Sequence, residues 1–184
     1  MPGEKIDPPT SSTVEVSKEG KGLMFASATW HFSTDRLPTE DRGDLLAVSR
    51  RYFRRENTGT GFTLTPLAEG AALAPGDEVE VQLSVRAKHA AEYVHLRDPR
   101  AAGLEPENAV SRWKFDLGLA FYEETRDSGT NFFFEQLPAG EYTLRYRLRA
   151  NMAGTFRVGP ATLQSMYAPE FNAYSAGAVL TVAP

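Results

Sequence analysis

Alternation of apolar and polar residues over short stretches is the feature that most constrains the fold of this chain. The clearest case is the stretch from Glu78 to Ala87, which follows a proline–glycine turn. A period of two places successive side chains on opposite faces of a β-strand, so one face can be buried and the other solvated. The predicted buried face consists of Val79, Val81, Leu83 and Val85. A second alternating stretch should supply Tyr142, Leu144 and Leu148 to the same core.

Similar stretches recur along the chain and are separated by turns rich in glycine and proline. Further strands are predicted at 47–55, 62–67, 93–98, 115–125, 131–135, 141–150, 155–163 and 177–183. No stretch keeps a helical period for ten residues, although Asp41 to Phe53 is ambiguous. Short strands at regular spacing are typical of a β-sandwich. We expect an all-β fold, an antiparallel β-sandwich of about seven strands with a short N-terminal hairpin.

Composition divides the chain of 184 residues into three parts. Residues 1–12 are rich in proline and serine, which indicates a linker. Residues 13–43 contain a predicted hairpin around the turn Glu19 to Gly22, followed by a polar boundary. Residues 44–184 carry the remaining strands. This length suits one domain with an appendage.

Bulk properties exclude several classes of protein. The chain has no cysteine, which excludes disulfides, zinc–thiolate sites and a cysteine nucleophile within it. The net charge is −4 with both signs interspersed, so no nucleic-acid footprint is present. No run approaches the roughly 18 apolar residues that span a bilayer, and we expect no membrane insertion. The start of the chain has no apolar signal core, so no signal peptide is predicted.

Residues that invite a catalytic interpretation each have a plainer one. Asp127 to Thr130 reads D-S-G-T, the string around the catalytic carboxylate of aspartic proteases. Such a site needs a second carboxylate that shares a proton, and the chain has no second copy of the string, so a turn is favoured. The histidines, His31, His89 and His95, show no metal-ligand spacing. We expect no enzymatic activity, no metal and no cofactor.

Two runs are informative about strand faces. In Phe132 to Phe134, successive residues alternate between faces, so at least one ring must point away from the core. Arg145, Arg147 and Arg149 form a ladder on the outer face of one predicted strand. Natural sheets protect their edges with such charges, and we favour this interpretation over a docking surface for a neighbouring domain.

The segment Gln164 to Phe171 reads QSMYAPEF and lies between two apolar runs. Pro169 cannot donate a ladder hydrogen bond and pushes the preceding residue toward extended geometry. We expect an extended loop between the last two strands. Because Met166 and Tyr167 are adjacent in this loop, they should point in different directions, and at least one should be substantially exposed.

This segment, followed by AYSAGAVLTV, resembles the end of the last domain of bacterial alpha-2-macroglobulin family proteins. Two more blocks agree, YVHLRDPRAAGLEP at 93–106 and, within 121–134, FYE, TRD and NFFF. The resemblance implies a C-terminal macroglobulin-type β-sandwich. The hairpin within 13–43 resembles the returning strands of the CUB-like domain that flanks the thioester domain.

The resemblance also implies a function, that of a non-catalytic domain in an exported, periplasmic or cell-envelope inhibitor that traps proteases. In the family, the residues that match Met166 and Tyr167 lie against the thioester domain and shield the thioester until the bait region is cleaved. The implied interface loop also contains Ser165, Ala168, Pro169, Glu170 and Phe171. A thioester needs a cysteine, so it would lie in another part of the parent chain. The implied partners are the thioester domain, the neighbouring domains and, through the parent, target proteases.

A free-standing β-sandwich module that binds carbohydrate or a surface partner is the alternative. Its platforms would be Trp30, Trp113 or Tyr122. An exposed planar row of aromatic rings would favour this module. A loop that projects Met166 and Tyr167 from one end would favour the macroglobulin interpretation.

Overall fold

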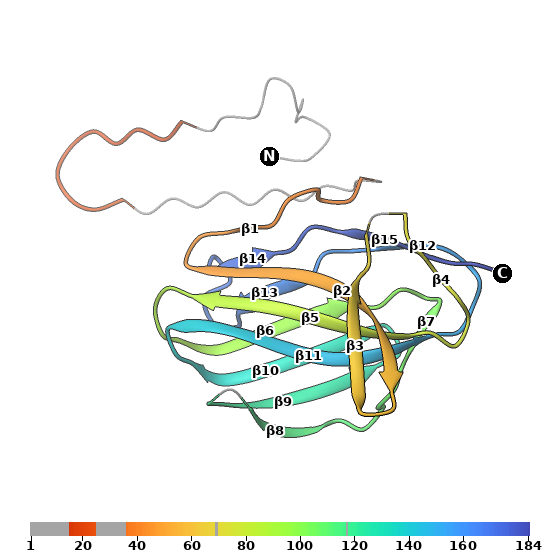
Figure 1. Cartoon of the computed structure of the whole chain (residues 1–184). Helices are drawn as coiled ribbons and strands as arrows, with labels where there is room; N and C mark the ends of the chain where they lie inside the picture. Colours follow the sequence, from red (N-terminus) through yellow and green to blue (C-terminus); the bar gives the residue numbers. More distant parts are fainter. Residues whose placement is uncertain (1–14, 25–35, 69, 117) are drawn as a thin grey trace. The chain divides into compact units, whose positions relative to one another are not determined.

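The computed structural model describes residues 15–24, 36–68, 70–116 and 118–184 (Figure 1). The chain divides into two compact units, Met1–Asp35 and Arg36–Pro184. In the first unit, residues 15–24 form no strand, and the rest of the predicted hairpin, with Trp30 and His31, lies outside the described residues. The second unit begins before residue 44 and contains every strand that the structure describes.

The second unit is an all-β sandwich, and the described residues contain no helix. Its seven-stranded sheet has the order β1 (Arg42–Gly43), β14 (Asn172–Tyr174), β13 (Thr162–Ser165), β6 (Ala91–Pro99), β10 (Gly129–Leu137), β9 (Leu119–Arg126) and β8 (Arg112–Asp116). Its five-stranded sheet has the order β3 (Gly61–Pro66), β2 (Leu46–Thr58), β5 (Glu78–Ala87), β11 (Gly140–Ala150) and β7 (Leu104–Pro106). A three-stranded sheet consists of β12 (Gly154–Val158), β15 (Ala178–Val182) and β4 (Ala72–Leu73).

The predicted fold class is confirmed, but the described strands number fifteen rather than about seven. Two predicted strands are in fact pairs. The stretch 115–125 contains a turn at Gly118, whose φ of 75° suits glycine, and the turn separates β8 from β9. The stretch 155–163 breaks at Gly159 and Pro160 into β12 and β13, which belong to different sheets. Proline lacks the N–H that a continuous ladder needs.

The core between the two large sheets is built around β5 and β11. The register places Leu144 opposite Leu83 and Leu148 opposite Val79. The predicted core residues of both strands are buried with one exception. Tyr142 is only partly buried, because it lies near the start of β11 and its hydroxyl donates to the carbonyl of Pro138 at 3.1 Å. The ambiguous stretch at 41–53 belongs mainly to β2.

A buried polar network crosses this core. Arg50 Nη1 lies 2.6 Å from Asp98 Oδ1, and both side chains are buried. The Tyr146 hydroxyl donates to Asp98 Oδ2 at 2.7 Å, and Arg50 Nη2 donates to the carbonyl of Gly159 at 2.8 Å. Burial raises the pKa of Asp98, while the Arg50 charge and the Tyr146 hydrogen bond oppose this shift. The network ties β2, β6 and β11 to the link between β12 and β13.

Two local predictions are confirmed on the seven-stranded sheet. Phe132 and Phe134 are buried, whereas Phe133 lies on the outer face and stacks on His95 with ring centroids 4.6 Å apart. Asp127 and Ser128 form the turn between β9 and β10. Arg100 donates to the carbonyl of Arg126 at 2.8 Å and also to that of Asp127. The D-S-G-T string therefore spans a hairpin turn, held by an arginine, and the first two residues of β10.

Candidate functional site

The candidate site is the loop that joins β13 to β14. The two strands pair in antiparallel register, Leu163 with Ala173 and Gln164 with Asn172, so the segment is a hairpin at one side of the seven-stranded sheet. The prediction that it joins the last two strands is wrong, because β15 follows β14. The strand β14 has only three residues, too few for alternation to indicate it.

The loop is compact rather than extended, which corrects the second part of that prediction. The chain bends at Met166 and Tyr167 and turns at Pro169 and Glu170. The amide of Ser165 donates to the carbonyl of Phe171 at 3.0 Å, and the amide of Phe171 donates to that of Ala168 at 2.9 Å. Asn172 Nδ2 donates to the carbonyl of Pro169 at 2.7 Å. Proline presets the backbone for a turn, so the loop satisfies much of its own backbone.

Both large side chains of the loop face solvent. Met166 is 55% exposed and Tyr167 is 79% exposed. The prediction that at least one of them would be exposed is confirmed, although the reason differs, because the chain bends at these residues. Exposed aromatic and apolar side chains on a folded loop favour an interaction site.

The other residues of the proposed interface loop divide into a surface group and a buried one. Pro169, Glu170 and Phe171 are exposed, and Ala168 is half-buried. Ser165 is the last residue of β13 and is buried. Ser165 therefore positions the loop through its backbone and offers no surface of its own.

Tyr93 on β6 is a part of the site that sequence reasoning missed. Its carbonyl accepts a hydrogen bond from the Met166 amide at 2.8 Å, and its ring meets Tyr167 edge-on with centroids 5.1 Å apart. Its φ of 50° is unusual for a residue with a side chain. Backbone of this kind costs about 1–3 kcal/mol and persists where the surrounding structure enforces it. No local pattern indicates a left-handed tyrosine.

A hollow of about 530 Å³ lies beside the loop. Its wall joins the start of β2, the turn between β5 and β6 and the loop itself, and includes Leu45, Ala90, Ala91, Tyr167 and Phe171. The wall is largely apolar, so it suits the packing of an apolar side chain. The residues that line it include no cysteine and no group of side chains that could hold a metal ion.

Comparison with protein families decides the identity of the fold. The family described as the bacterial alpha-2-macroglobulin MG10 domain matches residues 46–170, more than half of the chain, and the match includes Met166 and Tyr167. The chain belongs to this family. Macroglobulin domains belong to protease-trapping inhibitors, which are not catalytic.

Solved structures agree with the assignment of an MG10 domain. The Salmonella alpha-2-macroglobulin reacted with methylamine is 26% identical with a TM-score of 0.62, over 80% of this chain and 10% of that one. A mutant of the Salmonella protein is 25% identical with a TM-score of 0.63, over the same shares of the two chains. The Escherichia coli alpha-2-macroglobulin activated by porcine elastase is 24% identical with a TM-score of 0.63, over 79% of this chain and 14% of that one.

A curated relative of this MG10 domain is a protein of Dictyostelium discoideum. The "Circularly permutated Ras protein 2" of Dictyostelium discoideum is 26% identical over 180 residues, which cover 91% of this chain. The chain spans only 4% of that relative and about a tenth of the Salmonella proteins. These shares are those of one domain within much larger proteins.

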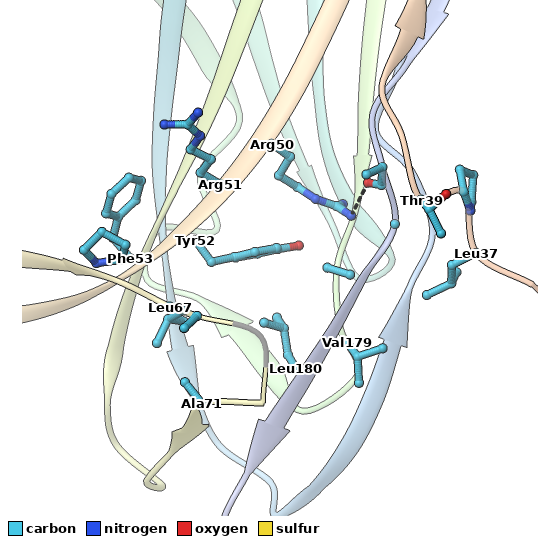
Figure 2. Close-up of a pocket in the computed structure, with 16 residues that line it drawn as sticks. Leu37, Thr39, Arg50, Arg51, Tyr52, Phe53, Leu67, Ala71, Val179 and Leu180 are labelled. Carbon is cyan, nitrogen blue, oxygen red and sulfur yellow. Dashed lines mark hydrogen bonds between the residues drawn. The ribbon is translucent and has the colours of Figure 1, made fainter.

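A second cavity of the MG10 domain, of about 560 Å³, lies between β2 and β15 (Figure 2). Its wall includes Leu67, Val179 and Leu180, together with Arg50 and Tyr52. The Arg50 guanidinium is already bonded to Asp98 and to backbone carbonyls. Burial raises the pKa of Tyr52, so its hydroxyl stays neutral. The other arginine that lines the cavity, Arg51, is exposed.

Neither a metal centre nor a membrane-crossing helix is found in the described part of the chain. Over residues 15–24, 36–68, 70–116 and 118–184, no three His, Asp or Glu side chains lie close enough to hold a metal ion. In the same ranges no helix has the length and apolarity needed to cross a bilayer. The loop between β13 and β14 remains the candidate site that the geometry supports best.

Proposed function

We propose that this MG10 domain is a non-catalytic part of a protease-trapping inhibitor of the bacterial envelope. Its loop at Met166 and Tyr167 docks on the thioester domain of the parent and shields the thioester until a protease cleaves the bait region. The observation that supports this role best is the joint exposure of these two side chains on a self-bonded loop beside an apolar hollow.

The chemistry of the two residues suits shielding. An activated acyl–sulfur bond is lost by hydrolysis if water or amines reach it, so it must be covered by groups that exclude water. A thioether is apolar and adaptable, and an aromatic ring covers a large area at small entropic cost. The ring of Tyr93 packs against Tyr167 and restricts its motion, so docking loses less side-chain entropy.

Release of the shield requires an interface of modest strength. The hollow and the loop together form a small contact area, which a conformational change of the parent can separate. A two-state arrangement of this kind responds to bait cleavage only if the docked and released states differ by a few kcal/mol. A large apolar interface would not meet this requirement.

The partners and the location follow from the same proposal. The partners of the MG10 domain are the thioester domain and the neighbouring domains of the parent, and proteases are met through the parent. One solved relative was reacted with methylamine and another was activated by elastase. We extend both reactivities to the parent of this chain, as an exported periplasmic or envelope protein.

The carbohydrate-binding alternative receives less support from the aromatic residues. Cross-strand register places His95, Phe133, Tyr122 and Trp113 in one row on the outer face of the seven-stranded sheet. The rings of His95 and Phe133 stack face to face, and those of Trp113 and Tyr122 are tilted by 60°. Rings that cover one another present edges rather than a flat platform, so the row favours cross-strand packing within the sheet.

No hydrolase activity is expected from the isolated chain. The D-S-G-T string lies in a hairpin turn, and a second carboxylate that shares a proton is required for that chemistry. Assays with casein and with chromogenic glycosides should give background rates. Turnover that disappears in Asp127→Asn would show that this expectation is wrong.

The double variant Met166→Ala, Tyr167→Ala should dock poorly without losing stability. Both side chains are exposed, so the free energy of unfolding of the isolated chain, measured by urea denaturation, should change by less than about 1 kcal/mol. Binding of the purified thioester domain to the immobilised chain should weaken at least tenfold. Leu163→Ala, at a buried position of β13, is the matched control and should cost about 2–5 kcal/mol. If the stable double variant binds the thioester domain as tightly as the wild type, the loop is not part of the interface.

A further inference from the structure

The strand β8 forms one end of the seven-stranded sheet (Figure 1). One edge of β8 pairs with β9, from Arg112 opposite Glu123 to Asp116 opposite Leu119. Among the residues that the structure describes, no strand pairs with its other edge. A free edge presents a row of backbone N–H and C=O groups that another strand can pair with.

This edge carries apolar side chains where edges are usually protected by charge. On the outer face of the sheet, Trp113 is 52% exposed and Phe115 is 82% exposed. Val110, just before the strand, is also exposed. By contrast, the outer face of β11, whose edge is covered by β7 only near its end, carries exposed Arg145 and Arg147. The charged side chains of β8 lie on its other face, so the outer face of this edge is apolar, and an exposed apolar edge marks an interaction site or an aggregation hazard.

The opposite face of β8 carries two basic side chains, Arg112 and Lys114, and one acidic side chain, Asp116. Arg112 and Lys114 line a cleft of about 200 Å³ together with Arg145 and Arg147. The carboxylates in the same cleft are already engaged: Glu123 with Lys114 at 2.6 Å, Glu80 with Arg145 at 3.8 Å, and Glu107 with Arg149 at 2.5 Å. Within the described part of the chain, Arg112 forms no hydrogen bond or ion pair. The cleft therefore holds cationic charge that is available to an acidic group.

We propose that β8 accepts an extended segment of another polypeptide as an additional strand, with apolar and acidic side chains in alternation. Successive side chains of such a strand point to opposite faces. Its apolar side chains would continue the row of Trp113 and Phe115, and its acidic side chains would face Arg112 and the cleft. Backbone pairing supplies affinity in this mode of binding, and the alternating side chains supply selectivity.

A second copy of this chain fits the edge less well. Antiparallel pairing of two β8 strands would bring the apolar side chains together on the outer face. It would also place the Arg112, Lys114 and Asp116 side chains of both copies on one face, where the basic side chains outnumber the acidic ones and like charges oppose pairing. The site is also separate from the shielding loop, because β9, β10 and β6 lie between β8 and β13 in the sheet. Both surfaces can therefore be occupied at once.

A labelled eight-residue peptide of alternating valine and glutamate tests the proposal directly. Fluorescence anisotropy with the full chain should show saturable binding, at least tenfold tighter than that of the matched valine–lysine peptide. Methylation of the backbone nitrogens of the valine–glutamate peptide should weaken binding at least tenfold, because it removes strand pairing. Arg112→Glu should weaken binding to a similar extent. Arg51→Glu, at an exposed arginine of β2, should leave it unchanged.

Circular dichroism and thermal melts would establish that both variants fold. Equal binding of the valine–lysine peptide, or full affinity of the N-methylated peptide, would overturn the proposal. Absence of saturable binding by the folded wild-type chain would do the same. Sedimentation that shows a dimer, dissociated by Phe115→Glu, would assign the edge to a second copy instead.

Discussion

Replacing Asp98 by alanine should lower the free energy of unfolding by about 3–5 kcal/mol, because it leaves the buried charge of Arg50 without its carboxylate. The Arg50 side chain is 1% exposed, and its remaining partners are the carbonyls of Gly159 and Ala176. Neutral carbonyls do not compensate a buried guanidinium as a carboxylate does. Tyr146 would lose its acceptor as well. Urea denaturation followed by tryptophan fluorescence measures the loss.

The same network should tolerate removal of both charges far better than removal of one. The double variant Arg50→Met, Asp98→Leu carries an apolar pair of similar volume. Its free energy of unfolding should lie within about 1–2 kcal/mol of the wild-type value, because the cost of desolvation offsets much of the gain from a buried ion pair. Asp44→Ala breaks an exposed pair with Lys88 and should leave stability nearly unchanged. A loss below about 1 kcal/mol for Asp98→Ala would mean that Arg50 reaches solvent and that the network does not hold the core.

Truncation of the paired leucines at the centre of the sandwich should have the second largest effect. Leu83 on β5 lies opposite Leu144 on β11, and both are almost fully buried. Leu83→Ala and Leu144→Ala should each cost about 2–5 kcal/mol, which combines lost burial with the cavity that remains. The loss of unfolding free energy in the double variant should differ from the sum of the two single losses. The two side chains are neighbours and share any cavity that remains.

Ser84→Ala is the matched control for this pair. Ser84 follows Leu83 on β5 but is exposed on the other face. Its replacement should therefore change the free energy of unfolding by no more than about 0.5 kcal/mol. Thermal melts and urea titrations should agree if the unit unfolds in one step. Losses below about 1 kcal/mol at both leucines would contradict the assignment of the strand faces.

Alternation predicted the central strands β5 and β11 well because one face of each strand packs in the core and the other face lies outside it. For β5 the predicted and observed bounds coincide, and for β11 they differ by one residue. Alternation failed where the chain changes sheet without losing its pattern. A single glycine at 118 turns β8 into β9, and Gly159 with Pro160 passes the chain from β12 to β13. Strands of two or three residues, such as β1 and β14, are too short to show a period.

The candidate site could be predicted in part. Adjacent large residues before a proline indicated a loop with an exposed Met166 or Tyr167, and both are exposed. The bends of the loop, the left-handed Tyr93 and the hollow at Leu45 and Ala90 depend on contacts between residues far apart in the sequence. Local patterns carry no signal for such contacts. The buried state of Arg50 is a similar case, since one arginine among several on β2 is indistinguishable from the others until the sheets pack.

The rate of free-thiol release from an unchallenged parent protein that carries the thioester tests the shielding proposal most directly. Without protease, the double variant Met166→Ala, Tyr167→Ala should release thiol to water and to methylamine faster than the wild type, because the groups that exclude both are gone. Tyr167→Phe keeps the ring and should release thiol at the wild-type rate. Equal rates for the double variant and the wild type, together with unfolding of the isolated double variant, would contradict shielding and leave the loop as a cap of its own sandwich.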